Sequence, residues 1–374
     1  MFCILPSSFK NSLMELSIIN NSYNNGYEIN RSLLRYTGCI ISNIKCGDKN
    51  NIIDSANPYF YLYNFLPNVG HSVSFMNNPY SFFVMVEVLN NIPNINIDIV
   101  NKSLHITEDG DCGFVEAVKH IYKIGDDKCI ILNNENENEN ENGSTERRSV
   151  HKSSSSSECN SDASNVNLFN KDTLFYFKNI HSDTFDLITS NIFAKNNAKY
   201  NKLLYQIVYA LNLQRHGGTF IFKMEEIHST HSLRLLFILS NIYRQVCLIK
   251  PYSSNICYDQ IYIVCSGFNK PENNIYDVIN ALLDDNTSSI DLGIKLPCLF
   301  TNKIEHFNSI VGQQKLYSLL YITNHDAKTS CHSEIINKNV RKCIAWCRKY
   351  NIPINEYLTG ASNIIAYKNV QGII

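Results

Sequence analysis

Short apolar runs alternate with amphipathic helical segments between residues 185 and 265, and this alternation constrains the fold most. Four runs have the length and composition of buried strands: 185–190, 219–222, 246–249 and 261–265. The segments 203–214 and 233–243 place apolar residues at helical spacing. Gly217 and Gly218 are predicted to end the first of these helices. Strands and helices in this order predict an α/β sheet.

The same pattern is found upstream. Residues 104–107 are typical of a strand, 114–122 of a helix and 129–132 of the next strand, which together form a βαβ unit. Further helices are predicted over residues 82–89 and 337–350. Residues 133–164 are dominated by Asn, Glu and Ser, so they are predicted to be a disordered insertion that interrupts the domain.

Composition excludes a strongly basic nucleic-acid-binding chain. Lys and Arg total 33 against 34 Asp and Glu, so any contact with RNA has to be local. The 13 cysteines include no CxxC pair, and no segment has the roughly 20 apolar residues that cross a bilayer. We therefore expect free thiols, a cytoplasmic setting and no membrane partner.

Three polar segments follow predicted strands, where sheets of this kind bind their ligands. They are the loop 108–113, with glycines at 110 and 113, then Lys223 after the strand 219–222, and finally the loop 250–260. Each also has an ordinary interpretation, as a turn, a surface lysine or a connection. A metal site could be assembled from Cys331, His332, Cys343 and Cys347, but the last two share an apolar helix face and are predicted to be core thiols.

Taken in order, these segments resemble the FtsJ-like RNA ribose 2′-O-methyltransferases, most closely the cap-type members from large DNA viruses. The family pattern "AL", "GG-hydrophobics-K" and "KP-x-x-SR-x-x-S-x-E-x-Y" is similar to residues 210–211, 217–223 and 250–262. The resemblance implies a Rossmann-type, S-adenosylmethionine-dependent fold with a mostly parallel sheet, an antiparallel last strand and helices on both faces. Antiparallel pairing of 246–249 with 261–265 is part of that expectation, and parallel pairing would favour a different Rossmann-type protein.

The resemblance also assigns candidate site residues. The family's Lys-Asp-Lys-Glu catalytic tetrad falls on Val84, Asn191, Lys223 and Gln260, so only Lys223 retains the family residue. The cofactor loop "E-x-P-G-G-F" is similar to 109–114, which implies that Asp109, Gly110, Gly113 and Phe114 bind S-adenosylmethionine. Asp111 and Cys112 replace Pro and Gly in that loop, and Asn255 replaces an arginine of the third motif.

These substitutions lead to one expected function and one alternative. The sequence predicts a methyltransferase-fold protein of residues 76–270, impaired in catalysis, that binds RNA, capped mRNA or the capping and transcription machinery. The alternative is an active cap 2′-O-methyltransferase that uses Lys223 with a neighbour such as Lys195 or Lys199. Residues 1–75 are predicted to be an N-terminal extension of unclear fold, and 271–374 a mainly helical C-terminal extension.

Overall fold

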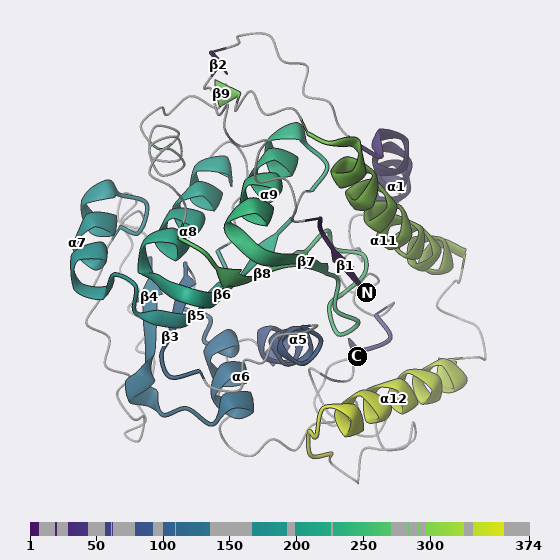
Figure 1. Cartoon of the computed structure of the whole chain (residues 1–374). Coiled ribbons are helices and arrows are strands. Elements are labelled where there is room, and N and C mark those ends of the chain that lie inside the picture. Colours follow the sequence, from purple (N-terminus) through teal and green to yellow (C-terminus); the bar gives the residue numbers. More distant parts are fainter. Residues whose placement is uncertain are drawn as a thin grey trace, which may run out of the picture.

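The fold is a seven-stranded sheet with helices on both of its faces (Figure 1). The computed structural model describes residues 1–6, 19–20, 29–43, 57–60, 62, 79–92, 100–108, 110–134, 167–192, 199–225, 227–270, 283, 290–291, 296–324 and 332–354. Most of the insertion predicted at 133–164 lies outside these residues.

The strand order is β1-β7-β8-β6-β5-β3-β4. The strands are β1 (Phe2–Ile4), β3 (Ser103–Thr107), β4 (Cys129–Asn133), β5 (Phe185–Ser190), β6 (Gln214–Met224), β7 (Tyr243–Ile249) and β8 (Ile261–Phe268). The strands β4, β3, β5 and β6 are parallel, and β8 is antiparallel to both β6 and β7. The predicted α/β class and the predicted antiparallel last strand are therefore confirmed. A separate pair joins β2 (Ile19–Asn20) to β9 (Ile290–Asp291).

Two hydrophobic cores sandwich the sheet. The helices are α1 (Arg31–Asn43), α5 (Pro79–Asn90), α6 (Gly113–Tyr122), α7 (Lys171–His181), α8 (Lys199–Leu213), α9 (Thr230–Ile242), α11 (Cys298–Asn324) and α12 (His332–Lys349). Figure 1 shows α7, α8 and α9 on one face and α5 and α6 on the other. Phe220 and Phe222 of β6 pack into the first core, and Ile221 between them packs into the second. This period-2 alternation buries both sides of a central strand, which explains its continuous apolar sequence.

The junction between α8 and β6 differs from the prediction. The helix ends at Leu213, four residues before Gly217, and the strand already begins at Gln214. The pairing of β5 with β6 shifts register between Phe185 and Leu187, and Gly217 has a φ of +78° within that irregularity. A left-handed φ favours glycine, so these glycines form a bulge in the strand rather than the end of the helix.

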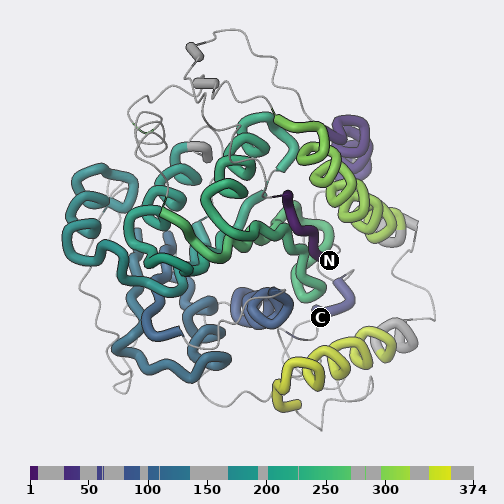
Figure 2. Tube along the Cα trace, viewed as in Figure 1, coloured from purple at the N-terminus to yellow at the C-terminus, as the bar shows by residue number. Residues whose placement is uncertain are grey.

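Segments outside residues 76–270 also contribute to the sheet and its cores. The strand β1 pairs antiparallel with β7 at the edge of the sheet (Figure 2). Phe300 and Ile304 of α11 belong to the first core, while Val340 and Trp346 of α12 belong to the second. Among the described helices, none is both long and apolar enough to span a bilayer.

Candidate functional site

The strand register brings three of the predicted site residues to one edge of the sheet. Ser190 of β5 pairs with Phe222 of β6, so Asn191 follows β5 beside Lys223. Lys223 in turn pairs with Tyr262 of the antiparallel β8, so Gln260 precedes β8 at the same edge. Lys223 shares its face of the sheet with Ile221, which packs toward α5 and α6. Asn191, Lys223 and Gln260 therefore lie at neighbouring ends of three adjacent strands, β5, β6 and β8.

A buried carboxylate, that of Asp111, lies beside Asn191 at this edge. Its Oδ2 accepts a hydrogen bond from the Asn191 amide at 2.9 Å and another from the Ser81 hydroxyl. Its Oδ1 accepts the backbone N–H of Gly113 at 2.9 Å. Asp111 is 5% exposed, so these three donors replace water around the charge. The network joins the loop after β3, the end of β5 and the start of α5.

A buried histidine, His105, also contacts the backbone of the same loop. The His105 ring contacts the Asp111 carbonyl through Nε2 at 3.0 Å and the Thr189 hydroxyl through Nδ1 at 2.9 Å. Gly113 starts α6 against α5, where an added Cβ would lie 2.7 Å from the Ser81 Cβ and 2.8 Å from the Phe82 nitrogen. Only glycine fits at that contact, so Gly113 acts here through packing.

Among the described residues, one buried polar atom at the end of β4 has no hydrogen-bond partner. Asn133 Oδ1 is buried and accepts no hydrogen bond from any described residue. Its Nδ2 lies 3.6 Å from the position that a Cβ on Gly110 would occupy, and Gly110 has a φ of +66°. An orphaned buried acceptor beside an open glycine can receive a hydroxyl of a bound ligand.

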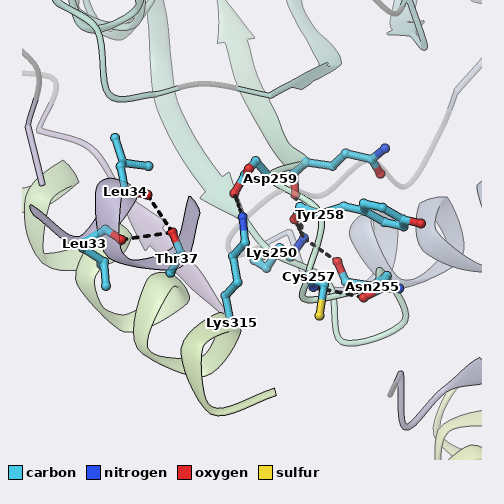
Figure 3. A network of polar contacts seen from close by, with 10 residues as sticks. Leu33, Leu34, Thr37, Lys250, Asn255, Cys257, Tyr258, Asp259 and Lys315 are labelled. Atoms are coloured by element: carbon cyan, nitrogen blue, oxygen red, sulfur yellow. Dashed lines mark hydrogen bonds and ion pairs between the residues drawn. The ribbon is translucent and has the colours of Figure 1, made fainter. Parts of the chain in front are cut away.

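The loop 250–260 is organised around the fully buried Lys250 (Figure 3). Its ammonium donates to the carbonyls of Asn255, Tyr258 and Gln260 at 3.0, 2.8 and 3.0 Å. Burial lowers the pKa of Lys250 to about 7. The three carbonyls accept all three hydrogens of the protonated amine, so Lys250 closes the loop internally rather than facing a ligand.

A second buried charge, Glu87 of α5, holds the other side of this loop. Its two carboxylate oxygens accept the backbone N–H groups of Tyr252 and Ser253, each at 2.8 Å. Oε2 also accepts the indole N–H of Trp346 at 3.0 Å, which ties α12 to the same point. Lys250 thus satisfies the carbonyls of the loop and Glu87 satisfies its amides.

Two contacts at the end of the loop fix the position of Gln260. Tyr80, at the start of α5, donates its hydroxyl to Gln260 Oε1 at 3.0 Å. The preceding residue, Asp259, forms an ion pair of 2.6 Å with the buried Lys315 of α11 (Figure 3). Helices on both sides of the loop therefore set where Gln260 lies.

The other sequence-predicted residues have different positions. Val84 is fully buried in the second core, and α5 reaches the site through Tyr80 and Ser81 instead. Phe114 is also fully buried and packs on His105 and Tyr262. Asp109 and Lys195 lie outside the described residues.

Two further groups of predicted residues are internal. The Asn255 side chain accepts the Cys257 N–H at 3.0 Å and is buried in its own loop. Cys343 and Cys347 are buried in the second core, as predicted for core thiols, and Cys331 is outside the described residues.

Sequence reasoning missed Asp111, Ser81, Tyr80 and Glu87 as parts of this edge. From the sequence, Asp111 is only a residue that replaces Pro in the resembled cofactor loop. One signal could have identified it: an acidic side chain in a loop that follows a buried strand. Its contact with Asn191 lies across 80 residues of sequence.

S-adenosylmethionine fits this edge only in part. The orphaned Asn133 oxygen and Gly110 suit a nucleoside hydroxyl. The Gly113 N–H, the Ser81 hydroxyl and the Asn191 amide, however, are already bonded to Asp111. A polar ligand part that reached this loop would meet donors that Asp111 already holds.

Comparisons with known proteins add sequence relatives. The chain matches no protein-family model. It is 32% identical over 80 residues to Cap-specific mRNA (nucleoside-2'-O-)-methyltransferase 1 of Homo sapiens, covering 21% of this chain and 10% of that protein. It is 38% identical over 66 residues to the protein of the same name in Trypanosoma cruzi, covering 18% of each. The chain thus spans less than a fifth of the length of these relatives.

A solved structure of a ribosomal RNA methyltransferase from Plasmodium falciparum aligns with 50% of this chain and 96% of its own, at 15% identity and a TM-score of 0.31. The fold is shown by the strand order of the sheet. By sequence, the chain is similar over about a fifth of its length to cap-specific mRNA 2′-O-methyltransferases, which supports its resemblance to the FtsJ-like 2′-O-methyltransferases.

Proposed function

We propose that this chain is an RNA-binding protein built on an FtsJ-like 2′-O-methyltransferase fold, in which methyl transfer is impaired. The support for RNA is the similarity to proteins named as cap-specific mRNA 2′-O-methyltransferases. We propose capped mRNA as the RNA and the capping or transcription machinery as the setting, because the relatives carry that name. The cytoplasm is the proposed location.

The observation that carries the impairment is the closed network around Asp111. Its carboxylate holds the Asn191 amide, the Ser81 hydroxyl and the Gly113 N–H. A ligand that needs these donors has to displace a buried charge-assisted network, which costs several kcal/mol. Position 191 also has an amide where the family has an acid, and Gln260 has an amide where the family has glutamate. Neither Asn191 nor Gln260 therefore supplies a carboxylate on the strands next to Lys223.

Calorimetric titration of the purified chain with S-adenosylmethionine tests the proposal without choosing an RNA. We expect a dissociation constant weaker than about 100 μM, corresponding to less than about 5.5 kcal/mol of binding free energy. Fluorescence anisotropy with a capped RNA oligonucleotide tests the RNA-binding half separately. Micromolar binding of the cofactor would overturn the impairment, and no binding of RNA would overturn the RNA-binding function.

One observation favours the active alternative. Asp111 returns a negative charge to the edge, 2.9 Å from the amide of Asn191, and Asn191 follows β5, the strand next to that of Lys223. An acid there could orient and charge-stabilise the lysine from the loop instead of from the strand. This alternative predicts methyl transfer to capped RNA that is lost in both Lys223→Ala and Asp111→Asn. Transfer of a radiolabelled methyl group by the wild type, absent from both variants, would favour it over the impaired protein.

A further inference from the structure

The exposed face of α12 carries a stripe of positive charge. Lys338, Arg341, Lys342 and Arg348 are all exposed, and the first three lie at i, i+3 and i+4, on one side of the helix. Among the described parts of the chain, no acidic side chain forms an ion pair with any of these four. The whole chain has a formal net charge of −1, so this stripe is a local excess of positive charge.

A hollow lies against the same face. Its volume is about 550 Å³, and its described lining consists of Asn337, Lys338, Arg341, Lys342 and Ala345. Three of these residues are cations, which only donate hydrogen bonds, and Asn337 has an amide. None of the five is acidic. The hollow is therefore suited to an anion.

The opposite face of α12 is already buried. Val340, Cys343, Trp346 and Cys347 lie in the second core, and the Trp346 ring meets Phe83 of α5 edge to face at 5.9 Å. A basic amphipathic helix that binds a membrane inserts its apolar face into the lipid. Here that face is covered by protein, so the stripe can act only through its charges. Figure 1 shows α12 at the periphery, beyond α5.

The helix that carries the stripe is linked to the candidate site through one residue, Glu87. Glu87 accepts the Trp346 indole N–H and also the two backbone N–H groups of the loop that leads to Gln260. α12 and this loop thus pack against the same buried carboxylate. Phosphates bound along α12 would therefore lie on the same side of the molecule as the loop 250–260, because both pack against Glu87.

We propose that the basic face of α12, formed by Lys338, Arg341, Lys342 and Arg348, binds the phosphate backbone of RNA. The proposal rests on the proposed RNA-binding function and names the surface that supplies it. The stripe from Lys338 to Arg348 is about 15 Å long, at 1.5 Å per helical residue. Its separated cations match a polyanion with charges spaced along a strand, in contrast to a single small anion. Binding of this kind has no sequence preference and weakens with salt.

The test compares two triple variants of the full chain. The first removes the stripe with Lys338→Gln, Arg341→Gln and Lys342→Gln. The matched control removes three exposed lysines elsewhere with Lys123→Gln, Lys128→Gln and Lys178→Gln. Both variants lose three positive charges, so a difference in their RNA affinity reports the position of the charges and not the net charge. The probe is a fluorescein-labelled, uncapped single-stranded RNA, with anisotropy measured from 50 to 300 mM salt.

We expect the stripe variant to bind RNA roughly 10- to 100-fold more weakly than the control at low salt. The slope of log affinity against log salt should fall by about 2, since each lost phosphate contact on a single strand contributes about 0.7. Equal binding by the two variants, with RNA binding by the wild type intact, would overturn the inference and leave the proposed function standing. A wild type that binds no RNA would overturn both. Preferential binding to phosphatidylserine vesicles over RNA would replace RNA by a membrane surface and overturn the inference.

Discussion

The Asn191 amide donates to the Asp111 carboxylate over 2.9 Å, across 80 residues of sequence. The amide belongs to the residue that follows β5, and the carboxylate belongs to the loop that follows β3. The same carboxylate also accepts the Gly113 N–H, so it ties this loop to the start of α6. Two residues that are far apart in the sequence thus form one interaction in the fold.

Asp111→Ala should weaken the fold and open the loop. The Asn191 amide, the Ser81 hydroxyl and the Gly113 N–H would lose their common acceptor, so we expect the free energy of unfolding to fall by about 1–3 kcal/mol. Affinity for S-adenosylmethionine should rise at least roughly tenfold, about 1.4 kcal/mol, as these donors become free. Urea denaturation and calorimetric titration measure the two effects. Asp127→Ala, at an exposed position, is the control and should change neither. Unchanged cofactor affinity in Asp111→Ala would show that Asp111 does not close the site.

The strands of the sheet could be predicted because buried strands have continuous apolar sequences. Strands covered on both faces are mostly apolar, and each of the runs at 104–107, 129–132, 185–190 and 261–265 lies within an observed strand. The end of α8 could not be placed in the same way. Two glycines are a common signal for the end of a helix, but here they allow a bulge in β6.

The site was less predictable than the sheet, because its contacts are distant in sequence. Strand order is sufficient to bring Asn191, Lys223 and Gln260 to one edge of the sheet. Glu87 contacts Ser253 across 166 residues and Trp346 across 259 residues. The helix α5 is apolar on all sides around Glu87, which indicates that this glutamate is buried, but the sequence does not show which groups it binds.

Glu87→Gln should loosen the loop 250–260 and the packing of α12. An amide has one acceptor oxygen where the carboxylate has two, and its NH₂ group would face a backbone N–H of the loop. We expect the free energy of unfolding to fall by about 2–3 kcal/mol. The chain has one tryptophan, and its indole N–H binds Glu87, so intrinsic fluorescence reports this contact directly.

The matched control for Glu87→Gln is Glu116→Gln. Glu116 forms a partly exposed ion pair with Lys119 at i, i+3, worth less than about 1 kcal/mol. Only the Glu87 variant should shift the emission of Trp346 to longer wavelength. An unshifted emission and a loss below 1 kcal/mol would mean that the loop is held in place without Glu87.

Lys250→Met should destabilise the fold because three buried carbonyls lose their donor. We expect a loss of about 3 kcal/mol at pH 7, measured by urea denaturation. Lys223→Met, at a partly exposed position on β6, provides the comparison for removal of a lysine from the same region and should cost less.

The contribution of Lys250 should also depend on pH, with a defined sign. Burial lowers its pKa from 10.5 to about 7 in the folded protein, so between these values the unfolded chain binds a proton that the folded chain does not. Unfolding then takes up a proton, and raising the pH opposes it. The free energy of unfolding of the wild type relative to Lys250→Met should therefore rise from pH 7 to pH 9.5 and stay level below pH 7. A difference that stays level up to pH 9.5 would show that the three carbonyls keep the amine protonated.

Deleting residues 137–164 should leave the melting temperature nearly unchanged. Asn134 is buried, donates its N–H to the Thr107 carbonyl at 3.0 Å and accepts the Leu168 N–H through Oδ1 at 2.9 Å. The two ends of the segment are thus already joined at its base, so a short connection can replace it. Asn134→Ala is the contrasting variant, because it leaves the Leu168 N–H without its acceptor and should lower stability by about 1–2 kcal/mol. Scanning calorimetry of both proteins decides the point. A drop of more than about 5 °C on deletion, which corresponds to more than 1 kcal/mol for a domain of this size, would mean that residues 137–164 pack against the fold.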